Sequence, residues 1–109
     1  MGDWAVTYDE VYLGDTYAGM ALASITEDKM SARIRESWRG ENGAGTIAGK
    51  YTVQPNCMIR WNYSDQDKTF SGVVHGIIVS ANKMFLVYSN PDLAKSGRAI
   101  AERVQYAPN

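Results

Sequence analysis

The chain of 109 residues has few of the features that mark particular classes of protein. Its single cysteine, Cys57, excludes an intramolecular disulfide and a cysteine-rich zinc site. Its single histidine, His75, leaves no second imidazole for a metal ion, so we predict no metal site. The chain has eleven basic and twelve acidic residues. This balance argues against a nucleic-acid partner, which needs an excess of positive charge.

Long apolar runs and nucleotide-binding motifs are missing as well. No run approaches the ~20 apolar residues that a membrane-spanning helix needs, so we predict no membrane partner. Glycine-rich phosphate loops, Walker motifs and EF-hands are absent, and we predict no cofactor. No signal peptide is visible after Met1. We therefore expect a cytoplasmic protein if Met1 is the native start, and a secreted one if a signal peptide was removed.

What the sequence does have is alternation between apolar and polar residues. From Met30 to Trp38, every second residue is apolar apart from Glu36, and serines and arginines occupy the positions between. Successive side chains of a strand point to opposite faces, so this pattern is typical of a strand with one dry side. Turn residues separate about eight β-rich runs, at 5–13, 17–25, 30–39, 47–53, 57–64, 69–80, 84–89 and 97–105. We predict an all-β protein, a small closed antiparallel β-barrel of about eight strands, formed by residues 1–109 as a single domain.

Two of these segments also fit a helix. Thr26 can cap a helix over 26–39, in which apolar residues recur at helical spacing. Asn90, with the proline that follows it, can begin another over 90–106. The alternation in the first segment and Gly97 in the middle of the second favour strands. The sequence alone leaves both alternatives open.

Two resemblances support a barrel. Segment 49–57 reads Gly-Lys-Tyr-Thr-Val-Gln-Pro-Asn-Cys and resembles a Gly-x-Tyr-x-Val-x-x-(Asp/Asn)-Cys pattern of small bacterial β-barrel proteins without assigned function. Trp4, in a Gly-Asp-Trp sequence, and Arg103 stand where calycins, the lipocalin- and avidin-type barrels, carry a tryptophan and an arginine. The second resemblance implies a calycin-like fold in which Arg103 packs across Trp4 and closes one end.

Aromatic residues dominate the faces that should be dry. Trp38, Tyr51, Trp61 and Tyr63 alternate with polar residues, so we expect them to point into one interior. Together with Tyr88, they are the candidates for binding a small apolar or aromatic molecule in the lumen. The alternative is that these rings only fill the core, because side chains alone can fill a barrel of ~8 strands.

Two titratable residues are candidates for catalysis. Glu36 lies on the apolar face of its predicted strand, where desolvation favours the protonated carboxyl and suits a general acid or base. A salt bridge to an interior arginine such as Arg103, or a position at the barrel rim, would explain it without catalysis. His75 lies in a strand whose faces are both apolar, so its side is undecided and a catalytic role stays open.

These candidates leave three alternatives for function. The favoured one is binding of a small molecule in the lumen. The second is a cofactor-independent cyclase or isomerase in which Glu36 moves a proton and the aromatic walls shape the substrate. The third is a fully packed barrel that acts through its surface, with a homodimer as the candidate assembly. A cavity would separate the first two from the third, and a polar pair facing it would separate the enzyme from the binding protein.

Two further expectations concern residues outside these candidate sites. Cys57 is expected to be a packed thiol on the apolar face of its strand, because nothing near it in sequence would stabilise a thiolate. The alternating Arg33, Arg35 and Arg39 are expected to form a solvated outer row.

Overall fold

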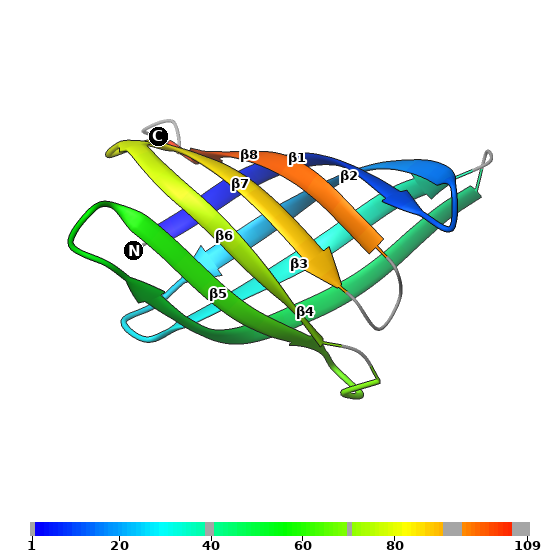
Figure 1. Cartoon of the computed structure of the whole chain (residues 1–109), viewed down its shortest axis with the longest axis horizontal. Helices are drawn as coiled ribbons and strands as arrows, with labels where there is room; N and C mark the ends of the chain where they lie inside the picture. Colours follow the sequence, from blue (N-terminus) through cyan, green and yellow to red (C-terminus); the bar gives the residue numbers. More distant parts are fainter. Residues whose placement is uncertain (1, 39–40, 70, 91–94, 106–109) are drawn as a thin grey trace, which may run out of the picture.

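A computed structural model describes residues 2–38, 41–69, 71–90 and 95–105. Eight strands pair in sequence order, each antiparallel to the next, and the last pairs with the first to close a barrel (Figure 1). The strands are β1 (Gly2–Tyr12), β2 (Asp15–Ile25), β3 (Lys29–Trp38), β4 (Glu41–Val53), β5 (Met58–Asp65), β6 (Ser71–Ser80), β7 (Lys83–Asn90) and β8 (Lys95–Arg103). The predicted all-β closed barrel is confirmed.

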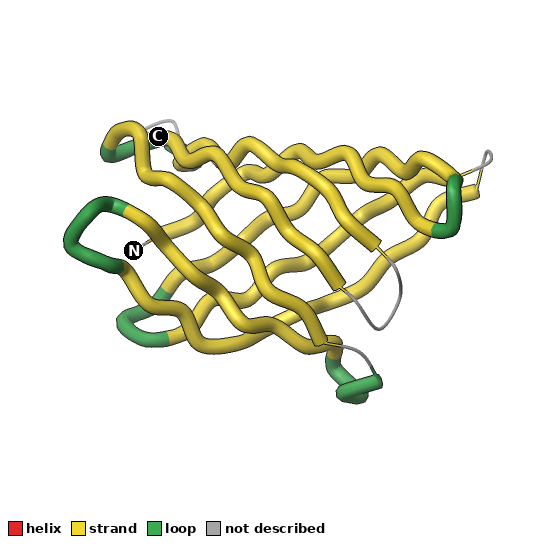
Figure 2. Tube along the Cα trace, viewed as in Figure 1, coloured by secondary structure: helices red, strands yellow, loops and turns green. Residues whose placement is uncertain are grey.

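Both segments with a helical alternative form strands. They contain β3 and β8, and Figure 2 shows strands and loops without a helix along the described residues. β3 pairs with β2 and β4, and β8 pairs with β7 and β1. Pairing on both edges satisfies the backbone groups of these segments and outweighs their local preference for a helix. Within the described ranges there is no helix long and apolar enough to cross a membrane.

Alternation along each strand divides the residues between lumen and solvent. In β1, Trp4 and Glu10 are buried, while the odd-numbered residues between them are exposed. On β3, Arg33 and Arg35 are exposed, as expected of an outer row, whereas Arg39 lies outside the described residues. The inner face therefore holds the apolar set.

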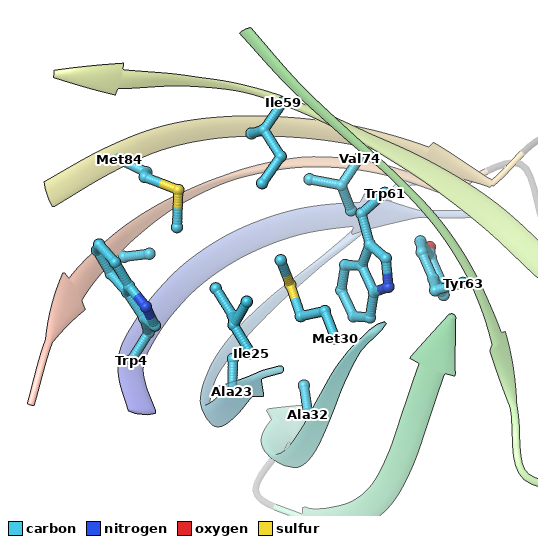
Figure 3. Packing of buried hydrophobic residues seen from close by; sticks show 11 residues of the cluster. Trp4, Ala23, Ile25, Met30, Ala32, Ile59, Trp61, Tyr63, Val74 and Met84 are labelled. Atoms are coloured by element: carbon cyan, nitrogen blue, oxygen red, sulfur yellow. The ribbon is translucent and has the colours of Figure 1, made fainter. Parts of the chain in front are cut away.

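The inward-facing residues form one apolar cluster (Figure 3). Its members are Trp4, Ala23, Ile25, Met30, Ala32, Ile59, Trp61, Tyr63, Val74, Met84 and Ala101. Burying one large apolar side chain contributes about 1.5–3 kcal/mol, so this cluster is the main source of stability.

β1 begins and β8 ends at the same end of the barrel (Figure 1). There, Trp4 of β1 and Arg103 of β8 are register partners. The guanidinium carbon of Arg103 lies 5.4 Å from the centre of the Trp4 ring, which is a cation–π distance. The Arg103 side chain thus packs against Trp4 at this end.

The start of β4 differs from the prediction. Alternation predicts a strand from residue 47, but β4 begins at Glu41, and Asn42 already pairs with Ser37 of β3. Residues 42–46 are small or polar and exposed, so they give no alternating signal. Backbone pairing does not need an apolar side chain, which is why the sequence pattern missed this part of the strand.

The expectation of a packed Cys57 thiol is wrong. Cys57 is exposed, has a φ of 65°, and its backbone N–H donates to the Gln54 carbonyl oxygen at 3.1 Å. It therefore ends the turn between β4 and β5 instead of beginning the strand. Its side chain lies outside the core because the left-handed backbone conformation breaks the alternation.

β4 and β5 approach closely at Gly49. A Cβ atom there would collide with the backbone carbonyl of Asn62 on β5. The same approach lets the Trp61 indole N–H donate to the Gly49 carbonyl oxygen at 3.1 Å. Glycine is required at this position, and the bond fixes one aromatic wall of the lumen.

We expect Gly49→Ala to lower the free energy of unfolding by about 1–3 kcal/mol, because the added methyl group forces the two strands apart. Gly45→Ala, on the same strand with open space around the added atom, should change it by no more than about 0.5 kcal/mol. Urea unfolding midpoints measure both effects. Equal midpoints for the two variants would contradict the close approach.

Candidate functional site

The lumen contains a cavity of about 130 Å³ that side chains do not fill. Figure 3 shows Trp4, Met30 and Trp61 pointing into the same apolar interior. Small residues from three strands line much of the wall: Ala21 and Ala23 on β2, Ala32 on β3, and Ala99 and Ala101 on β8. Because these side chains are short, they leave space in a barrel interior that larger residues would fill.

Trp4 lines the cavity near the end of the barrel at which β1 begins. Its side chain is buried, and its indole Nε1 has no hydrogen-bond partner among the described residues. A buried N–H without a partner is uncommon in native proteins. The cavity therefore has an unused donor in its apolar wall.

The opposite end of the cavity carries two hydrogen-bonded tyrosine–glutamate pairs. The Tyr8 hydroxyl donates to Glu36 Oε1 at 2.7 Å, joining β1 to β3. The Tyr88 hydroxyl donates to Glu10 Oε1 at 2.8 Å, joining β7 to β1. The Tyr8 and Tyr88 rings meet edge to face with centroids 6.1 Å apart, so the two pairs are neighbours. We call this region the polar end.

Lys95 provides the positive charge for one of these carboxylates. Its Nζ lies 3.0 Å from Glu10 Oε2, and the Glu10 side chain is only 3% exposed. Lys95 and Glu10 therefore form an ion pair, although Glu10 Oε2 accepts no hydrogen bond of regular geometry from the described residues. Glu36 is half-buried, and within the described residues no cation lies at ion-pair distance from it. Glu10 therefore has a cation in contact with it among the described residues, and Glu36 does not.

Cross-strand glycines position the tyrosines of the lumen. Each tyrosine ring occupies the place where its paired glycine would carry a side chain, so the ring lies over the neighbouring strand. The pairs are Tyr8 with Gly19, Tyr63 with Gly72, and Tyr88 with Gly97. An aromatic ring over a strand glycine compensates for the packing that glycine lacks.

The lumen tyrosines keep their protons over the ordinary pH range. Burial raises the pKa of Tyr8 and Tyr88 well above the usual range, and the carboxylates that accept their hydrogen bonds raise it further. Burial, followed by the charge of Glu10, raises the pKa of Tyr63 to about 12. All three phenols are therefore hydrogen-bond donors at neutral pH.

Asn90 is the most deeply buried polar residue of this region. It is fully buried, and neither Nδ2 nor Oδ1 has a hydrogen-bond partner among the described residues. Its strand places Met84, Leu86 and Tyr88 on the cavity wall, and Asn90 follows on the same face. The Asn90 amide lies close to the Tyr63 hydroxyl, and it opposes the rise in the pKa of Tyr63. No hydrogen bond of regular geometry joins the two side chains.

The structure brings four of the predicted catalytic and ligand-binding residues to the cavity, in addition to Trp4. They are Glu36, Trp61, Tyr63 and Tyr88. Tyr51 packs against the apolar cluster without lining the cavity, and its hydroxyl donates to the Thr26 carbonyl oxygen at 2.7 Å. Trp38 belongs to β3, but its side chain lies outside the described part of the structure.

His75 lies away from the cavity. It is exposed on the outer face of β6, between two buried neighbours, and its register partner on β5 is the exposed Arg60. The described residues contain no group of three or more His, Cys, Asp and Glu side chains that could hold a metal ion. The candidate site is therefore the lumen and its polar end.

Sequence reasoning missed Tyr8, Glu10, Lys95 and Asn90 as residues of the site. A signal for the first two exists, because Tyr8 and Glu10 continue the alternation that begins at Trp4. No local signal marks Lys95, which meets Glu10 only through the pairing of β1 with β8.

Comparisons with known proteins support the architecture. No protein-family model matches the chain, and no curated protein matches its sequence. A de novo designed fluorescence-activating β-barrel matches with a TM-score of 0.60 at 14% identity, covering 94% of this chain and 92% of that chain. The redesigned barrel b11L5F_LGL matches with a TM-score of 0.67 at 13% identity, covering 95% and 90%. The redesigned barrel mFAP0, bound to DFHBI, matches with a TM-score of 0.65 at 16% identity, covering 94% and 96%.

These similarities define the class of fold, a small closed antiparallel barrel of eight strands. At such low identity they show the fold alone. The relation to calycins stays a resemblance in the placement of Trp4 and Arg103.

The raised pKa of Tyr63 predicts a loss of stability at alkaline pH. Unfolded tyrosine ionises near pH 10, whereas folded Tyr63 holds its proton to about pH 12. Between these values the unfolded chain binds fewer protons than the folded one, so the free energy of unfolding falls as pH rises, by up to about 1.4 kcal/mol per pH unit for one group. Tyr63→Phe should make this fall shallower in urea titrations. Parallel pH profiles for the two proteins would contradict the shift.

Proposed function

We propose that the barrel binds a small apolar or aromatic molecule, about the size of one ring, in its lumen. The unfilled cavity carries this proposal, because protein cores are close-packed and seldom retain such a void. A dry engineered cavity of about 150 Å³ binds benzene, so a cavity of about 130 Å³ suits a single ring. Drug-sized molecules need roughly 300 Å³ or more.

The walls and the architecture support the same conclusion. Trp4 and Trp61 offer aromatic faces, and Trp61 and Tyr63 meet with centroids 5.3 Å apart. A barrel of ~8 strands has an interior just wide enough for side chains or one small ligand. The redesigned barrels mFAP0 and mFAP1, which share this fold, are each bound to the small molecule DFHBI.

Toluene is a probe of the right size for this cavity. It should raise the thermal unfolding midpoint, by the equivalent of about 2.7 kcal/mol at a concentration of about 100 times Kd. It should also change the tryptophan fluorescence, since Trp4 and Trp61 line the cavity. Ala32→Leu fills the cavity and should abolish both effects, whereas Ala5→Leu on the outer face should preserve them.

Failure of toluene to stabilise the wild-type protein would contradict lumenal binding. So would an undiminished response in a folded Ala32→Leu variant, because the ligand would then bind elsewhere. Circular dichroism of both variants verifies that they fold.

A second candidate function is a cofactor-independent isomerase or cyclase. The observation that favours it is the Tyr8 hydroxyl donating to Glu36 at the cavity wall, a polar pair that faces the apolar space. Glu36 would take a proton from one carbon of the substrate and return it to another. Once Glu36 holds this proton, the Tyr8 hydroxyl would turn from Glu36 to the oxyanion of the intermediate and donate its hydrogen bond there. The aromatic walls would hold the ring in place.

If the protein has this activity, it should isomerise a six-membered β,γ-unsaturated cyclic ketone to its conjugated isomer. Glu36→Gln should reduce the rate by about 10²–10⁴-fold, as removal of a general base does. Glu102→Gln, the same change on the exposed face of β8, should leave it unchanged. Ultraviolet absorbance of the conjugated product follows the reaction. Equal rates for wild type and Glu36→Gln would exclude this role for Glu36.

The cavity argues against a fully packed barrel that acts only through its surface. The outer face still carries exposed apolar neighbours, since Phe85 of β7 pairs with Ile77 of β6 and Ile100 of β8. A homodimer that covers these residues stays a prediction.

A further inference from the structure

The polar end of the lumen has more negative than positive charge. Glu10 and Glu36 line the cavity, and Lys95 is the one cation that does so among the described residues. Lys95 is committed to Glu10 by its 3.0 Å contact, and its Nζ also lies 5.4 Å from the centre of the Tyr12 ring. Glu36 is left without a cation in the described part of the chain. Because Glu36 is only partly exposed to water, its charge attracts a cation in the lumen more strongly than a surface carboxylate would, so this position favours a positively charged ligand.

Glu36 also retains capacity to accept hydrogen bonds. Tyr8 donates to Oε1, and the other carboxylate oxygen receives no hydrogen bond from the described residues. A carboxylate has roughly four lone-pair sites, so one hydroxyl leaves most of them unused. Because Glu36 lines the cavity, a polar group on a bound ring could pair with this oxygen.

Asn90 is a second unused acceptor at this end of the barrel, beside Tyr63 and not among the residues that line the cavity. It is fully buried on the lumen face of β7, and its amide oxygen accepts no hydrogen bond from the described residues. An unsatisfied buried amide costs free energy unless something pairs with it.

The surrounding rings suit a cation. Tyr8 and Tyr88 both line the cavity, and their rings meet edge to face. Ring faces attract ammonium groups, and more strongly where water is excluded. Lys95 already uses this attraction over Tyr12 and Tyr17, at 5.4 and 6.0 Å.

We propose that the lumen selects ring-sized molecules that carry a primary ammonium group. The ring occupies the apolar cavity, and the ammonium binds the free carboxylate oxygen of Glu36 at the polar end. An ammonium group has three donors, which match the unused acceptors of this region. This inference rests on the proposed lumenal binding and adds the chemical class of the ligand.

The test compares three probes of one ring size that differ in charge: benzylammonium, toluene and benzoate. Isothermal titration calorimetry at neutral pH should show benzylammonium binding the wild-type protein at least about tenfold more tightly than toluene, which corresponds to about 1.4 kcal/mol. Benzoate should bind more weakly than toluene because it would meet Glu36 with a like charge. Glu36→Gln should remove the preference for benzylammonium and leave the affinity for toluene unchanged.

Glu102→Gln is the matched control, since it makes the same change on the outer face of β8 and should alter none of the three affinities. If toluene binds and benzylammonium binds no better, the inference is overturned and the proposed lumenal binding stands. A preference for benzylammonium that survives Glu36→Gln also overturns it. If none of the probes binds, the proposed function fails and the inference with it. Should Glu36→Gln not fold, the order of the three affinities in the wild-type protein decides alone.

Discussion

Closure of the sheet between β1 and β8 is the constraint on which the rest of the structure depends. It removes the exposed edges that would invite association with another chain. It also forces every residue on the inner face of each strand into one enclosed space. The volumes of those residues then decide whether the lumen is solid or hollow. The alanines of β2, β3 and β8 leave it hollow, and the rings of Trp4 and Trp61 keep it apolar.

Closure also explains why the polar groups lie together. Tyr8 and Glu36 are 28 residues apart, and Tyr88 and Glu10 are 78 apart, yet each tyrosine reaches its glutamate over the glycine of the single strand between them. Away from bulk water, a hydrogen bond to a carboxylate is stronger than it would be on the surface. The glycines paired with the tyrosines let the rings lie over neighbouring strands. The region is therefore ordered by the barrel itself, which suits a site that must hold a ligand in one orientation.

The strands could be predicted from the sequence because burial on one face imposes a period of two. That period identified β3 and β5, and it correctly placed Trp61, Tyr63 and Glu36 on the inner side. It failed at residues 42–46, where small and polar side chains are exposed while the backbone still pairs, and at Cys57, where a turn interrupts the alternation. The cavity could not be predicted, because its volume depends on inward residues from all the strands and on their register. The contact between Lys95 and Glu10 depends in the same way on strand pairing across the whole chain.

The position of the two chain ends has a consequence for how the barrel can be joined to other proteins. β1 begins and β8 ends beside Trp4 and Arg103, at the end of the barrel opposite the tyrosine–glutamate pairs (Figure 1). A domain joined to the start of β1 or the end of β8 would extend from the end that carries Trp4 and Arg103, and it would leave the polar end unobstructed. The barrel can thus be tethered, displayed or fused in tandem with its polar end directed outward.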